Sequence, residues 1–88
     1  MKLTVNDMEY LKWFGFREEE APLLEEKVDQ IEYRVNGHAA TRYDAARQLG
    51  NHRFLASLYQ ALYKGEQVFL ANSGACVEFI THTPATNT

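Results

Sequence analysis

The apolar pattern of the chain changes its period at Gly65, and this change constrains the fold more than any other feature of the sequence. Over residues 52–64 the apolar side chains recur at helical spacing and cover a wide arc, as in a largely buried helix. After Gly65, two short runs at 68–71 and 75–80 flank the turn residues 72–74, which is typical of a β-hairpin. A helical segment followed by a hairpin in 88 residues predicts a small α+β domain.

A second long helix is expected over about residues 22–35. Pro22 suits the first turn of a helix, because the N–H that proline lacks would be unpaired there. The apolar residues that follow recur at intervals of four, three and four positions: Leu24, Val28, Ile31 and Val35. The pair Asn36-Gly37 should close this helix. Its opposite face would be acidic and carry Glu25, Asp29 and Glu32.

Two residue pairs have the spacing of a capping box and predict where the first and third helices begin: Asn6 with Glu9, and Thr41 with Asp44. Gly15 and Gly50 should end these helices, and Asn51 should cap the fourth. We therefore expect four helices and a C-terminal β-hairpin in a single globular domain over residues 1–82, with a flexible tail over 83–88. A lone hairpin is marginal in water, so it must pack on the helices or join other strands.

Charge is unevenly distributed along the chain. Residues 1–33 carry nine acidic and four basic side chains, residues 34–65 carry five basic and one acidic, and the remainder adds Glu66 and Glu78. The balance is therefore −5, +4 and −2, which gives the net charge of −3. Such asymmetry indicates either a surface for a charged partner or attraction between two helices of one domain.

The basic segment resembles a helix-turn-helix motif over about twenty residues. Ala46 and Gly50 have the spacing of the small residue and the turn glycine of that motif. Asn51 departs from it, because an apolar residue usually follows the glycine, and the fourth helix is rich in core residues. An αα-hairpin is the alternative. If the segment binds nucleic acid, with the hairpin as a wing, the contacts would come from Arg42, Arg47, Arg53, Gln60 and Lys64.

The sequence favours a non-enzymatic module that contacts another protein, with nucleic-acid binding as the alternative. An aromatic cluster, Trp13, Phe14 and Phe16, is expected to cap the core, although aromatic residues are also enriched at interfaces. The acidic face of the second helix is typical of a solvated surface, and imitation of a phosphate backbone is its alternative reading. The hairpin has apolar groups on both faces, which predicts a homodimer. The candidate interface residues are Trp13, Phe14, Phe16, Phe69 and Phe79. A phage or mobile-element accessory protein would suit either function, although only the length suggests it.

No cofactor, metal or catalytic group is predicted. The soft metal ligands His38, His52, His82 and Cys76 have no ligand-like spacing, and the five glycines form no phosphate-binding loop. A single cysteine in an apolar strand is usually inert, and it cannot form an intrachain disulfide, so a reducing compartment is expected. No apolar run resembles a signal peptide or a membrane span. We therefore expect a cytoplasmic protein that is not an enzyme.

Overall fold

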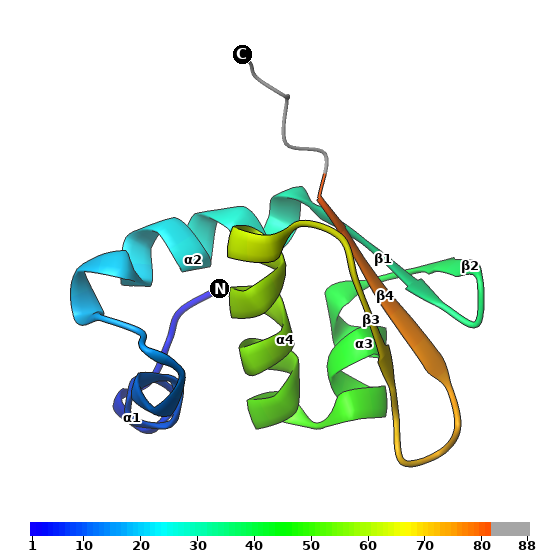
Figure 1. Cartoon of the computed structure of the whole chain (residues 1–88), viewed down its shortest axis with the longest axis horizontal. Coiled ribbons are helices and arrows are strands. Elements are labelled where there is room, and N and C mark those ends of the chain that lie inside the picture. Colours follow the sequence, from blue (N-terminus) through cyan, green and yellow to red (C-terminus); the bar gives the residue numbers. More distant parts are fainter. Residues whose placement is uncertain (82–88) are drawn as a thin grey trace.

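The computed structural model describes residues 1–81 and confirms the α+β class (Figure 1). Within these residues, four α-helices and four β-strands follow one another in the order α1 (Val5–Leu11), α2 (Ala21–Lys27), β1 (Ile31–Val35), β2 (His38–Ala40), α3 (Arg42–Leu49), α4 (Asn51–Lys64), β3 (Gln67–Leu70) and β4 (Cys76–Thr81). Short 3-10 turns η1 (Lys12–Phe14), η2 (Glu18–Glu20) and η3 (Val28–Gln30) flank the first two helices. The end of the expected domain at residue 82 and the expected tail lie outside the described residues.

The strands form one antiparallel sheet in the order β2-β1-β4-β3. The C-terminal hairpin is therefore half of a larger sheet, because β4 pairs with β1 as well as with β3. Tyr33 lies opposite Phe79 in the first pair, and Phe69 lies opposite Val77 in the second. Pairing with a second hairpin provides the partner that an isolated hairpin lacks in water.

The expected helix over 22–35 is wrong in its second half. The helix ends at Lys27, η3 follows, and Ile31 begins a strand. Asn36 and Gly37 do not cap a helix but form a tight hairpin turn, with φ of 53° and 83° respectively. Two left-handed residues in succession are typical of the type I′ turn that joins β1 to β2. Because Glu25 and Asp29 now lie before the strand and Glu32 within it, the expected acidic face of one helix does not exist.

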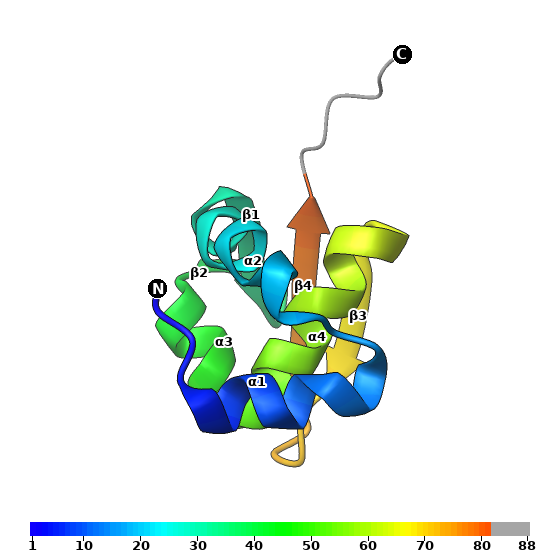
Figure 2. The same ribbon diagram turned by 90° about the vertical axis from the view of Figure 1, so that its left-hand side faces the viewer.

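Helix α4 lies between the sheet and α1 (Figures 1 and 2). It buries Phe54 and Leu58 against core residues that include Phe79 of the central strand β4. Rings of Tyr33, Phe54 and Phe79 lie within 5.7 Å of one another, centroid to centroid. All four helices lie on one side of the sheet in Figure 1, which leaves the opposite face without a helix over it. This arrangement makes α4 the centre of the core, as its broad apolar arc predicts.

Helix limits agree with the sequence in part. The capping box of Thr41 and Asp44 is confirmed, and Gly50 ends α3. The box expected from Asn6 and Glu9 is wrong, because Thr4 and Asp7 form it instead. Thr4 has the extended backbone that a cap requires, whereas Asn6 is already helical. Asn51 is likewise the first residue of α4, and Gly50 occupies the cap position.

Candidate binding surfaces

A hollow of about 490 Å³ opens between the N-terminal region and the C-terminal half of α4. Two segments line it that are about forty residues apart in the sequence. Its lining residues are Phe14, Gly15, Arg17, Glu20, Tyr59, Gln60, Tyr63 and Lys64. Aromatic rings and charged groups together give this hollow the mixed character of a contact site for another molecule.

The turn at Gly15 places Phe14 and Phe16 on different sides of the chain. Gly15 adopts φ of 92°, a conformation that L-residues with side chains rarely take. Phe16 then turns into the core and meets the ring of Tyr59 edge-on at 5.7 Å. Phe14 remains exposed at the rim of the hollow. The buried phenylalanine thus anchors the segment that carries the exposed one.

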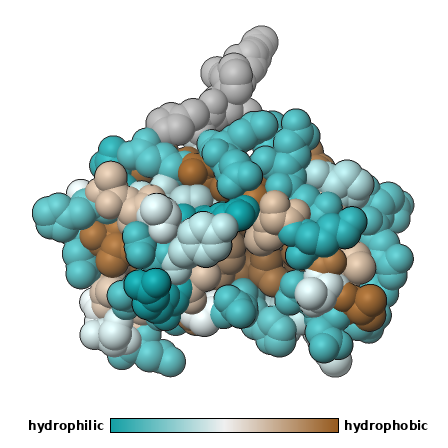
Figure 3. Space-filling model, turned by 180° about the vertical axis from the view of Figure 1, so that it is seen from behind, coloured by the Kyte–Doolittle hydropathy of each residue, from teal (hydrophilic) through white to brown (hydrophobic). Residues whose placement is uncertain are grey.

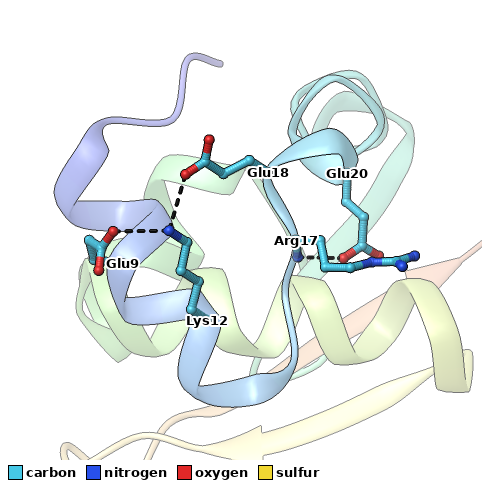
Figure 4. A network of polar contacts seen from close by, with 5 residues as sticks. All are labelled: Glu9, Lys12, Arg17, Glu18 and Glu20. Atoms are coloured by element: carbon cyan, nitrogen blue, oxygen red, sulfur yellow. Dashed lines mark hydrogen bonds and ion pairs between the residues drawn. The ribbon is translucent and has the colours of Figure 1, made fainter.

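The carboxylate of Glu20 ties this segment to α4. It accepts a hydrogen bond from the Tyr59 hydroxyl at 3.1 Å and another from the Tyr63 hydroxyl. The backbone N–H of Arg17 donates to the same carboxylate at 2.8 Å, and the side chain of Arg17 extends alongside it (Figure 4). Nearby, Lys12 pairs with Glu9 at 3.0 Å and with Glu18 at 3.1 Å.

These contacts shift the ionisation of the groups involved. The Tyr63 hydrogen bond is the main cause that lowers the pKa of Glu20 below its ordinary value. The same bond raises the pKa of Tyr63 to about 12, and burial together with Glu20 raises the pKa of Tyr59. At neutral pH Glu20 is therefore charged and both tyrosines are neutral. This set of groups orients rings and stays in one protonation state, which suits binding better than proton transfer.

Three exposed aromatic side chains belong to the two segments that line the hollow, whereas a fourth, Tyr43, is exposed on α3. Trp13 is 87% exposed in η1, Phe14 follows it, and Tyr63 is 58% exposed at the end of α4. We call Trp13, Phe14 and Tyr63 the aromatic surface. The expectation that Trp13 and Phe14 cap the core is wrong, because only Phe16 of that cluster is buried.

Of the other candidate interface residues, Phe79 is fully buried and Phe69 is half-buried, and both face the helices. The side chains of Phe16 and Phe79 are therefore not available to a partner in this structure. On the face opposite to that of Figure 1, apolar groups are scattered in small patches among hydrophilic ones (Figure 3). Exposed aromatic side chains, more than a broad apolar patch, thus mark the candidate surface.

The structure distributes the candidate nucleic-acid contacts over separate places. Arg42 forms an ion pair with Asp29 at 3.2 Å and donates to the Tyr43 hydroxyl. Arg53 donates to the carbonyl of Leu70 at 2.6 Å, at the edge of the sheet. The remaining three lie elsewhere: Arg47 is exposed near β2, and Gln60 and Lys64 line the hollow. The five residues are thus split between α3, the edge of the sheet and the hollow.

Helix α4 is also more enclosed than a recognition helix. It buries six residues, and α1 packs on it across from the sheet. The ring of Tyr10 from α1 stacks on His52 with centroids 4.4 Å apart, so α1 contacts the N-terminal turn of α4, where a recognition helix would meet bases. A single residue, Gly50, joins α3 to α4.

Other kinds of site find no support within residues 1–81. No three His, Cys, Asp or Glu side chains of this part of the chain lie close enough to hold a metal ion. His82, one of the soft ligands in the sequence, lies outside it. The described helices include none with the length and apolar character needed to cross a membrane.

Comparison with protein-family models, with curated proteins and with solved structures finds no match for this chain.

Sequence reasoning missed Arg17, Glu20, Tyr59 and Tyr63. One available signal was the spacing of Tyr59 and Tyr63, which places both rings on one side of a helix. Nothing local indicates that Glu20 lies beside them, since 39 residues separate it from Tyr59.

Proposed function

We propose that this chain is a non-enzymatic binding module that contacts another protein through the aromatic surface. The observation that carries the proposal is the 87% exposure of Trp13, which directly precedes Phe14 in the lining of an open hollow. Tryptophan and tyrosine are the residues that most often dominate the binding energy of protein interfaces. A solvent-exposed tryptophan has apolar area to bury on a partner, and the hollow beside it can receive a partner side chain.

The hydrogen bonds of Glu20 support this function, because they hold Tyr59 and Tyr63 in place before a partner arrives. A pre-ordered surface loses less side-chain entropy on binding than a mobile one. The lining also offers opposite charges, with Arg17 and Lys64 beside Glu20, so polar groups of a partner can pair at the rim of the contact.

Nucleic-acid binding remains the weaker proposal. Tight binding to nucleic acid, with an affinity that falls steeply as salt rises, needs several basic side chains on one face that contact phosphates. Here Arg42 is paired with Asp29, and Arg53 is bonded to Leu70. Because the basic side chains are dispersed and two of them are already bonded within the chain, contact with a protein is the stronger proposal.

Affinity capture from an extract of source cells, followed by titration of each captured protein in purified form, tests the proposal. Trp13→Ala should weaken binding by at least about tenfold, the usual loss at a central aromatic contact. Leu23→Ala is the matched control, because Leu23 is exposed on α2 away from the hollow, and it should bind as the wild type does. Equal binding by Trp13→Ala and the wild type would refute the aromatic surface as the site.

A duplex titration at two salt concentrations separates the two functions. The module should bind mixed-sequence DNA no more tightly than micromolar at physiological salt. A tight affinity that falls steeply with salt, and that is lost in the double variant Arg47→Ala with Lys64→Ala, would favour nucleic-acid binding instead.

A further inference from the structure

Strand β3 is an edge of the sheet, and its exposed side chains are unusually apolar for an edge strand. It pairs with β4 on one side, and no strand of the described chain pairs with it on the other. Val68 and Leu70 are 55% and 66% exposed, on the face of the sheet that no helix covers. Natural edge strands usually carry charges, prolines or a covering segment, because an open apolar edge invites another strand.

The hydrogen-bond pattern shows which backbone groups of β3 face outward. The N–H of Ala71 donates to the carbonyl of Ala75, so Ala71 faces β4. The direction of the backbone groups alternates along an antiparallel strand. The N–H and carbonyl of Phe69 therefore also point toward β4, while those of Val68 and Leu70 point toward the open edge. The bond from Arg53 to the Leu70 carbonyl agrees with this assignment. The same alternation directs the backbone N–H and carbonyl of Val68 away from β4, the only strand with which β3 pairs within residues 1–81.

We propose that two copies of this chain associate by pairing their β3 strands antiparallel, which joins two four-stranded sheets into one. This inference is independent of the proposed function, since it uses a different surface. It specifies the homodimer that the apolar hairpin predicts, and it places the contact at the β3 edge.

One register about the twofold axis suits the side chains best. With the two Phe69 residues at the axis, Val68 of each copy lies opposite Leu70 of the other. In this register the N–H and carbonyl groups of Val68 and Leu70 in each copy all find partners in the other copy. Glu66 then lies opposite Asn72 of the second copy, so no like charges meet. Centring the pair on Val68 instead would place Glu66 opposite the apolar Leu70. The favoured register thus combines backbone pairing with an apolar cluster across the axis.

Arg53 competes with this association. Its guanidinium occupies the Leu70 carbonyl, which must be released before a second strand can bond there. A charged side chain at an edge is a common device against strand addition. The Leu70 carbonyl at the edge is therefore already bonded to Arg53, whereas the backbone groups of Val68 are open to a second strand. Self-association should be weak, and substitution of Arg53 should change its strength.

Sedimentation of the full chain over a range of concentrations tests the proposal. The wild type should form a dimer at high micromolar concentration. Val68→Pro should remove the dimer without unfolding the chain, because the N–H lost at this position does not bond to β4. Val68→Thr is the matched control, since it keeps the N–H and the branched side chain, and it should still dimerise. Arg53→Ala should tighten the dimer by roughly fivefold.

Amide hydrogen exchange provides a readout that survives if the proline variant folds poorly. The N–H groups of Val68 and Leu70 should exchange rapidly in dilute solution and become protected as concentration rises, whereas that of Phe69 should be protected throughout. A wild type that stays monomeric at high micromolar concentration would overturn the proposal. Dimerisation that Val68→Pro leaves intact and Trp13→Ala abolishes would also overturn it, and would place the contact at the aromatic surface.

Discussion

Replacing Leu58 by alanine should remove a large part of the stability of this domain. Leu58 is fully buried in α4 and belongs to the core between the sheet and α1. The substitution deletes three carbon atoms, a loss of about 2.4 kcal/mol at ~0.8 kcal/mol for each buried methylene. The cavity left behind raises the expected loss to about 3–5 kcal/mol, within the range measured for buried leucines.

That loss is large against a total of about 4–13 kcal/mol expected for 88 residues. A loss of ~1 kcal/mol shifts the melting temperature of a domain this size by about 4–8 °C. The melting temperature, followed by circular dichroism, should therefore fall by at least ~12 °C. Leu23→Ala is the control, because it removes the same atoms from an exposed helical position, and it should cost well under ~1 kcal/mol. Equal melting of the two variants would show that α4 is not the centre of the core.

Three further perturbations test local features. Gly37→Ala should destabilise the β1–β2 turn by about 1–2 kcal/mol in urea unfolding, because Gly37 has φ of 83°. A loss as small as that of an ordinary surface change would contradict the turn assignment. Thr41→Ala should cost about 1 kcal/mol through loss of the α3 cap, again in urea, whereas Thr41→Ser should cost little. The lowered pKa of Glu20 means that its bonds stabilise the folded state above the ordinary value of 4.5 and cease to do so as the pH falls through the lower folded value. Glu20→Gln should therefore be less stable than the wild type at pH 7, and the difference should vanish in acid; a difference that is constant with pH would contradict the role given to the Tyr63 bond.

The sequence predicted the elements whose determinants are local. Thr41 and Asp44 begin α3 because a cap and its reciprocal bond need four consecutive residues and nothing else. Gly50 and Gly65 limit α4 for a similar reason, since both adopt positive φ. The hairpin was predicted to within one residue at each strand, because a change of period around a turn is also a local signal.

Tertiary contacts decided the conformation of residues 31–35. Ile31 and Val35 fit a helical stripe that begins at Leu24, and they fit equally well the alternation of a strand that includes Tyr33. Both patterns turn Ile31 and Val35 toward the core, so the spacing of these two residues could not choose between a helix and a strand. Strand β4 makes the choice, because its central position requires backbone partners on both sides, and β1 supplies one row of them.

The candidate surfaces depended on the same long-range pairing. Glu20 reaches Tyr59 and Tyr63 only after α4 has packed, and β3 becomes an open edge only because β1 takes the other side of β4. The sequence alone placed apolar and charged groups on their elements. Which of them meet, and which remain exposed as Trp13 and Val68 do, was decided by pairing between segments about forty residues apart, where no local propensity acts.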